Sequence, residues 1–198
     1  MKRERTAIIL TIIIIFSMIV VTESLVFHEL NMNRGLSFTD EDVIITINGT
    51  IAEFYARYAL VNYEEISTYL IRLPFALKPW DIDLYFNNEL LNFIWTSIRV
   101  DPEPGYFDAI AFEVNIPRYQ KLDVEVYYKR NYEEVTVNET LKGLYRYIVG
   151  STRSWGKPLN FAHFELWEVE NSTKIPLESR DYTNWLPEET FLYFYFDL

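Results

Sequence analysis

The side chains of this sequence that are best suited to chemistry are carboxylates, which occur in close pairs along the chain. Glycoside hydrolysis uses two such groups facing each other across the bond to be broken, with the pKa of one raised by burial. Asp81 and Asp83 stand out, because they share one face of an expected strand beside Trp80. An exposed face of an edge strand explains the same spacing more simply. The other clusters are Asp40/Glu41/Asp42, Glu64/Glu65, Asp101/Glu103, Glu133/Glu134 and Glu188/Glu189. A carboxylate-dependent hydrolase is therefore only the third interpretation of this chain.

Other catalytic chemistries find no matching residues. The chain contains no cysteine, which excludes disulfides, zinc–thiolate sites, iron–sulfur clusters and a cysteine nucleophile. Its two histidines, His28 and His163, are too few for a histidine metal site and have no triad pattern around them. The acidic segments 39–42 and 101–108 lack the ligand spacing of an EF-hand loop. We therefore expect a protein that is not an enzyme and has no cofactor and no metal.

Tryptophan and asparagine side chains in expected turns indicate binding or modification instead. Trp155 and Trp185 lie in predicted loops, where flat aromatic faces can stack on sugar rings or mark a protein interface. Carbohydrate binding through these two residues is the alternative function. Asn48, Asn138 and Asn171 each begin an Asn-x-Ser/Thr sequence, so they are candidate N-glycosylation sites.

The N-terminal segment predicts export from the cytoplasm. Lys2, Arg3 and Arg5 precede an almost purely apolar run that starts at Ala7. The run to Val21 would span about 22 Å as a helix, less than the roughly 30 Å of a bilayer core, which favours a cleaved signal peptide. However, no Ala-x-Ala-like cleavage site follows, and the run can continue through residues 25–27. We expect an uncleaved anchor over residues 7–27, with a cytoplasmic N-terminus and an extracytoplasmic C-terminal part; secretion is the alternative.

Charge and aromatic content describe the exported part. The chain has 29 Asp and Glu against 18 Lys and Arg, a net charge of −11. A surface of this sign repels phosphate backbones, so nucleic acid is excluded as a partner. With 14 Phe, 15 Tyr and 5 Trp, the chain has enough large aromatic side chains to build a core without disulfides.

Alternation of apolar and polar residues predicts an all-β domain. Asn48-Gly49 is a strong hairpin signal, typical of a type I′ turn between two strands. We expect a membrane anchor or signal peptide over residues 1–27, a juxtamembrane segment over 28–42 broken by the acidic cluster, and a β domain over 43–198. About ten short strands without a long amphipathic helix favour an antiparallel, immunoglobulin-like β-sandwich. A closed β-barrel is the alternative fold.

The layout resembles membrane-anchored β-sandwich proteins exported by archaea. The likeness covers the basic, Ile-rich leader, the cysteine-free acidic domain and the segment Leu144-Tyr-Arg-Tyr-Ile-Val-Gly-Ser-Thr-Arg-Ser-Trp155. It implies an immunoglobulin-like fold at the cell membrane and no functional residue. We therefore expect a non-catalytic module that binds a protein partner in the cell envelope.

Overall fold

Alternating sequence patterns become long β-strands in the computed structural model, which describes residues 35–65, 67–155 and 157–198. Gly35–Leu198 forms one unit of the chain. Its elements are β1 (Leu36–Asn48), β2 (Ile51–Asn62), β3 (Thr68–Pro74), β4 (Trp80–Phe86), β5 (Glu89–Leu90), β6 (Ile94–Ile98), β7 (Phe107–Asn115), β8 (Lys121–Asn131), β9 (Glu133–Val137), β10 (Thr140–Ile148), the 3-10 helix η1 (Gly150–Trp155), β11 (Leu159–Glu170), β12 (Thr173–Trp185) and β13 (Phe191–Asp197).

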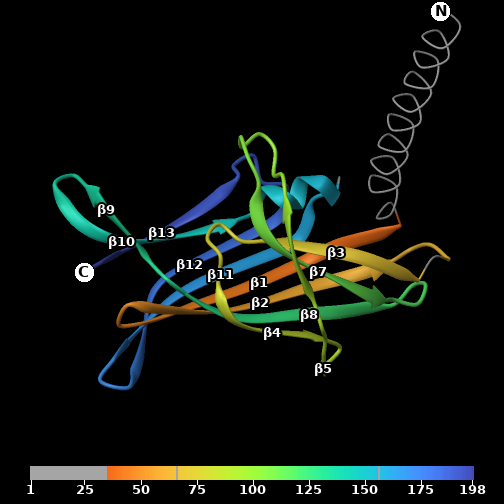
Figure 1. Ribbon diagram of the computed structural model, residues 1–198, viewed down its shortest axis with the longest axis horizontal. Coiled ribbons are helices and arrows are strands. Elements are labelled where there is room, and N and C mark those ends of the chain that lie inside the picture. Colours follow the sequence, from red (N-terminus) through yellow and green to blue (C-terminus); the bar gives the residue numbers. More distant parts are fainter. Residues whose placement is uncertain (1–34, 66, 156) are drawn as a thin grey trace, which may run out of the picture. The chain divides into compact units, whose positions relative to one another are not determined.

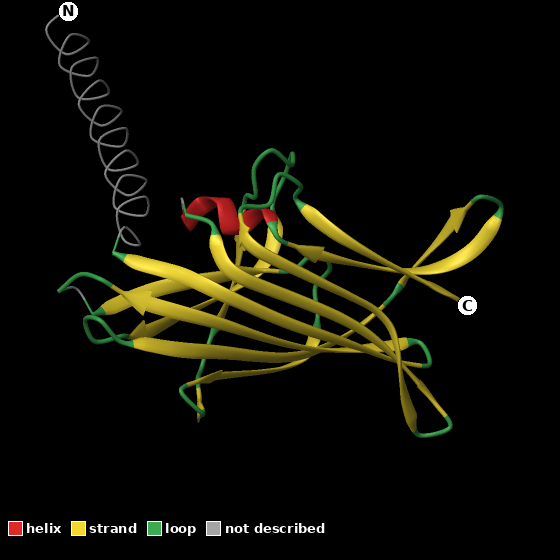
Figure 2. Ribbon diagram, turned by 180° about the vertical axis from the view of Figure 1, so that it is seen from behind, coloured by secondary structure: helices red, strands yellow, loops and turns green. Residues whose placement is uncertain are grey.

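The strands form three sheets. The largest has seven strands in the order β12-β11-β1-β2-β8-β4-β5, and its long strands lie side by side in both views (Figures 1 and 2). The two smaller sheets have the orders β13-β10-β9 and β3-β7-β6. All paired strands are antiparallel except β1 and β11, which are parallel. The larger of two apolar core clusters joins the sheets and includes Ile45, Ile71, Phe112, Tyr145 and Phe194.

The all-β prediction is confirmed, but the finer arrangement differs from the expected one. The described residues form thirteen strands in three sheets, whereas an immunoglobulin-like sandwich has two sheets. The closed barrel is wrong, because the seven-stranded sheet ends in the edge strands β12 and β5. Alternation shows which face of a strand is buried but not which strand lies beside it, so the pairing of β1 with β11 could not be read from it.

Two-residue turns join four of the hairpins. The predicted hairpin at Asn48 and Gly49 is confirmed, with the turn one residue later than expected: Asn48 pairs with Ile51, and Gly49 and Thr50 form the turn. Only Gly49 of these two has a positive φ, which fits a type II′ turn rather than type I′. The other three turns have positive φ at both residues, as in type I′: Asn87-Asn88, Asn138-Glu139 and Asn171-Ser172.

Only part of the N-terminal prediction falls on residues that the structure describes. The anchor over residues 1–27 and the first residues of the juxtamembrane segment lie outside them. Strand β1 begins at Leu36, before the predicted domain start at Val43, and the acidic cluster lies inside the strand instead of breaking the chain. Within the described part, no helix has the length and hydropathy needed to span a membrane.

Candidate functional site

A bulge in β1 directs one acidic side chain into the core. Val43, Ile45 and Ile47 alternate toward the interior, and the same alternation continues back to Glu41. Beyond it, Phe38 pairs with Leu60 and Asp40 with Ala59, so Thr39 is an extra residue between them. The bulge places both Phe38 and Glu41 on the buried face. The Thr39 hydroxyl has two acceptors for its single hydrogen, Asp40 Oδ2 at 2.9 Å and the Ala59 carbonyl at 3.2 Å.

Glu41 is buried at the end of a hydrogen-bond chain. Its side chain is only 2% exposed. The Tyr147 hydroxyl donates to Glu41 Oε1 at 2.7 Å, and the Tyr58 and Tyr147 hydroxyls lie 2.6 Å apart. Because a phenol carries one hydrogen, Tyr58 donates to Tyr147 whenever Tyr147 donates to Glu41. Glu41 Oε2 is also buried, and it has no hydrogen-bond partner among the described residues.

Burial changes the acidity of the three groups. Burial raises the pKa of Glu41 to about 7, although the hydrogen bond from Tyr147 acts to lower it. Burial also raises the pKa of Tyr58 and of Tyr147 well above the ordinary value of 10. The two phenols therefore stay neutral donors at physiological pH, while the carboxyl changes charge near neutrality. Groups with such shifted pKa values are concentrated at functional sites.

A pocket opens at Glu41 and is lined by residues from all three sheets. Glu41 and Tyr58 come from the seven-stranded sheet, Tyr147 from β10, residues 71–74 from β3, and Trp155 from η1, which is red in Figure 2. The pocket has a volume of about 40 Å³. A cavity needs roughly 10–15 Å³ to hold one water, so the pocket has room for about three water molecules.

Aromatic rings form one wall of this pocket. The ring of Phe38 lies 5.6 Å from that of Tyr58 and 5.9 Å from that of Trp155, tilted against both. Leu60 and Ile71 add apolar surface. The arrangement combines a single buried carboxyl with aromatic walls, which suits a compact polar group rather than a large apolar ligand.

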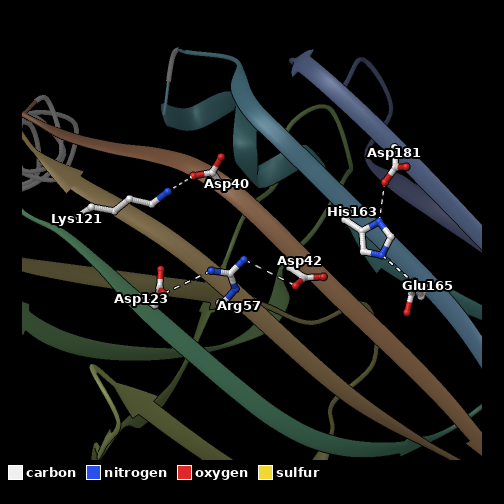
Figure 3. Close-up of polar contacts among 8 residues, drawn as sticks. All are labelled: Asp40, Asp42, Arg57, Lys121, Asp123, His163, Glu165 and Asp181. Atoms are coloured by element: carbon white, nitrogen blue, oxygen red, sulfur yellow. Dashed lines mark hydrogen bonds and ion pairs between the residues drawn. The ribbon is translucent and has the colours of Figure 1, made fainter.

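The opposite face of the seven-stranded sheet is a separate, self-paired polar surface (Figure 3). Arg57 contacts Asp42 at 3.8 Å and Asp123 at 3.5 Å, and Lys121 pairs with Asp40. Arg57 on β2 contacts carboxylates on both neighbouring strands, β1 and β8, whereas the pair of Lys121 and Asp40 joins β8 to β1 across β2. Cross-strand partners of opposite charge stabilise a sheet. The described residues include no group of three metal-ligating side chains placed to hold an ion. We assign this surface a structural role.

His163 belongs to the same surface. Its Nδ1 lies 2.6 Å from Asp181 Oδ1 and its Nε2 lies 3.1 Å from Glu165 Oε1 (Figure 3). Partial burial lowers the pKa of His163, but the two carboxylates outweigh it, so the net shift is upward. The ring links β11 to Asp181 on β12, and its two carboxylate partners favour its protonated form.

The two tryptophans singled out for sugar stacking lie in different surroundings. Trp155 is the last residue of η1, is half-buried and lines the Glu41 pocket. Trp185 ends β12, where its ring stacks on Tyr182 at 4.3 Å and meets Phe164 edge-on at 5.8 Å. Both tryptophans pack against the core, and of the two only Trp155 also lines the Glu41 pocket.

The glycosylation candidates all lie at exposed hairpin ends. Asn48 is the last residue of β1, and Asn138 and Asn171 are the first residues of two type I′ turns. Asparagine tolerates the positive φ that these turns need, which is reason enough for its presence at 138 and 171. Exposure is compatible with modification at all three.

The carboxylate pair proposed for hydrolysis is exposed. Asp81 has a φ of 58° at a register shift of β4, and its carboxylate lies 3.3 Å from Lys129 Nζ. Asp83 lines a shallow surface groove with Glu125. Neither carboxylate is buried as a general acid needs to be.

The sequence signal for the buried carboxyl is the strand alternation from Val43 to Ile47, which continues back to Glu41. In the sequence-based prediction, Glu41 instead belongs to an acidic cluster that breaks the chain.

No protein-family model matches the sequence, and no curated protein matches it in sequence. The fold resembles that of a Legionella pneumophila protein provisionally described as nutrient-binding, with a TM-score of 0.66 and 10% identity. The match covers 82% of this chain and 67% of that protein.

Weaker matches are parts of larger peptidases. Legionella pneumophila aminopeptidase A gives a TM-score of 0.44 at 16% identity, over 69% of this chain and 16% of the enzyme. An M1 zinc metallopeptidase of Deinococcus radiodurans gives 0.41 at 14% identity, over 68% of this chain and 32% of the enzyme. This chain thus spans less than a third of either enzyme. Matches this weak support no conclusion about this chain, and the archaeal resemblance stays a prediction.

Proposed function

We propose that this chain is a non-catalytic binding module displayed outside the cytoplasm, with the Glu41 pocket as its binding site. The observation that carries this proposal is the buried Glu41 carboxyl, whose Oε2 has no hydrogen-bond partner among the described residues of an aromatic-walled pocket. A buried charge without full pairing lowers stability. Such costly groups persist where function requires them.

The pocket favours binding over hydrolysis. Glu41 is the single carboxylate among the described residues that line it, whereas glycoside hydrolysis uses two that face each other. The Legionella protein that shares the fold is provisionally described as nutrient-binding, and the proposal extends a role of that kind to this chain. At 10% identity, that likeness supports the fold alone, so the residues of the pocket are the stronger support.

The location rests on the N-terminal sequence. Lys2, Arg3 and Arg5 before an apolar segment predict a cytoplasmic N-terminus and a membrane anchor over residues 7–27. A protein held in this way would bring the pocket close to partners in the cell envelope. Secretion after cleavage of the segment remains the alternative.

Carbohydrate binding is the second candidate, because Trp155 lines the pocket. A space with room for about three waters is too small to enclose a sugar ring. A sugar would have to stack on Trp155 at the pocket mouth. Its binding would then depend on Trp155 and not on Glu41.

Thermal unfolding of the full-length protein with small solutes tests the proposal. The panel is methylammonium chloride, acetamide, sodium acetate and glucose, with wild type compared against Glu41→Leu, in which a similar volume replaces the carboxyl. We expect at least one of the first three solutes to stabilise wild type, by about 2.7 kcal/mol at one hundred times its Kd, and to leave the variant unchanged. A panel without effect on wild type, or with equal effects on both proteins, overturns the proposal. Stabilisation by glucose that is lost in Trp155→Ala selects the carbohydrate alternative.

A further inference from the structure

We propose that the Glu41 pocket binds a compact primary ammonium group, which pairs with the Glu41 carboxylate and displaces the proton that otherwise occupies it. This inference rests on the proposed function and names the ligand class of the same site. Its first support is the set of hydrogen-bonding atoms that Glu41, Tyr58 and Tyr147 present at the pocket.

These atoms accept hydrogen bonds rather than donate them. Glu41 Oε2 is buried without a partner among the described residues, and Tyr147 already donates its hydrogen to Oε1. Tyr58 uses its hydrogen on Tyr147, which leaves lone pairs on the Tyr58 oxygen. An alkylammonium group has three N–H donors and no acceptor. An ammonium group therefore matches two acceptors that line the pocket, the Glu41 carboxylate and the Tyr58 phenol oxygen.

The walls and the size of the pocket fit the same ligand. The rings of Phe38, Tyr58 and Trp155 lie together at the pocket, and aromatic faces attract cations within about 6 Å of their centres. The volume of about 40 Å³ admits a group of the size of methylammonium. The net charge of −11 attracts cations toward the protein as a whole.

Among the charged and titratable groups in this region, the Glu41 carboxylate is the main counter-ion for a bound ammonium group. They are Tyr58 on β2, Tyr128 on β8, Tyr147 on β10 and Arg72 on β3. The three phenols have raised pKa values and stay neutral. Arg72 also lines the pocket, and its charge is not among the causes that move the pKa of Glu41. From the other neighbouring elements, β11 presents Ala162 and η1 presents the uncharged side chains of residues 151, 152 and 155.

Binding is coupled to proton release. Below pH 7 the Glu41 carboxyl is mostly protonated, since its pKa is about 7. The ammonium group keeps its own protons, because alkylamines titrate near the lysine value of about 10.4. One proton therefore leaves the carboxyl for the buffer as the ion pair forms. With a pKa of about 7, affinity is expected to fall about tenfold from pH 8 to pH 6.

Isothermal titration calorimetry of the full-length protein with methylammonium chloride tests this coupling. Titrations at pH 6 and pH 8, at matched ionic strength and in two buffers of different ionisation enthalpy, measure both the affinity and the protons released. We expect saturable binding that is about tenfold weaker at pH 6, with close to one proton released per ligand at that pH. The matched control is Glu53→Gln, which removes an exposed carboxylate from the other face of the sheet and should bind like wild type.

Two pocket variants complete the design. Glu41→Gln keeps the size of the side chain, and we expect it to fold and to lose binding. Tyr147→Phe keeps the carboxyl but removes the hydrogen bond that lowers its pKa, so the pH at which affinity falls should move upward. Binding that survives in Glu41→Gln, or that is independent of pH in wild type, overturns the inference.

The neutral and anionic probes separate the failure of this inference from the failure of the proposed function. If acetamide or acetate binds wild type as well as methylammonium does, and Glu41→Leu loses that binding, the pocket is a binding site but the ammonium assignment is wrong. If none of the three probes binds, both are wrong.

Discussion

Glu41 has an acidic neighbour on each side, yet only this residue of the three faces the core. Asp40 and Asp42 point to the other face, where Lys121 and Arg57 neutralise them. Glu41 meets phenol groups instead of a cation, so its charge is not compensated there. The difference arises from strand alternation and the bulge at Thr39, and it separates a structural carboxylate from a candidate binding group.

The first prediction concerns stability and pH. The folded pKa of Glu41, about 7, lies above its unfolded value of 4.5, so the folded state holds its proton more tightly. Stability contributed by this proton is present at low pH and is lost as pH rises from 4.5 through 7. Relative to Glu41→Gln, we expect wild type to lose about 2 to 3 kcal/mol of unfolding free energy between pH 5 and pH 8. Urea denaturation at both pH values measures this, and a difference that does not change with pH would contradict it.

His163 should couple stability to pH in the same direction as Glu41, but through the stabilisation of its charged form by its carboxylate partners. Its folded pKa is raised by Asp181 and Glu165 against partial burial, so its contribution is full below the unfolded pKa and is lost as pH rises through the folded value. We expect His163→Gln to lower the thermal midpoint more at pH 5.5 than at pH 8.5. An equal loss at the two pH values would show that the ring acts only through packing.

At the scale of elements, local turns were predictable and sheet neighbours were not. The hairpin at Gly49 and the turn at Asn87 follow from residues that accept positive φ, which is a local property. The parallel contact between β1 and β11 joins segments more than a hundred residues apart, which no local pattern reports. The pocket depends on such contacts, because Glu41 and Tyr147 come from different sheets. The sequence therefore predicts Trp155 as a binding residue, and Trp155 does line the pocket, but it does not single out the Glu41 carboxyl.

Gly143 on β10 gives an element-scale prediction. An added Cβ would overlap the ring of Phe196, its partner on β13. That ring cannot move easily, because it stacks on Tyr145 at 5.5 Å and meets Tyr132 edge-on at 5.3 Å. We expect Gly143→Ala to cost about 1–3 kcal/mol of unfolding free energy, measured by guanidinium denaturation.

A double variant tests the cause of that loss. Phe196→Leu in the Gly143→Ala background should recover part of the stability, because the smaller side chain makes room for the methyl group. A strictly additive loss would mean that the ring is not the obstacle.

At the scale of the whole molecule, we propose an exported protein whose binding site is the Glu41 pocket. The three sheets meet at the pocket, so a ligand bound there contacts elements from all of them. Occupancy should therefore stabilise the described unit as a whole instead of one hairpin.

Membrane fractionation with intact mass measurement tests the position. We expect the full-length mass of 23.7 kDa in the membrane fraction, released by detergent and not by high salt, because an apolar segment rather than surface charge holds it. A soluble protein with the mass of a chain that begins near residues 23–25 would establish secretion instead.

The most direct measurement is an infrared pH titration of the Glu41 carboxyl, taken as wild type minus Glu41→Gln, with and without methylammonium. The account predicts one carboxyl that titrates near pH 7 in the free protein and at lower pH with the ligand, since the ammonium group binds only the ionised form. A carboxyl that titrates near 4.5 without ligand, or whose titration methylammonium leaves unchanged, would contradict it.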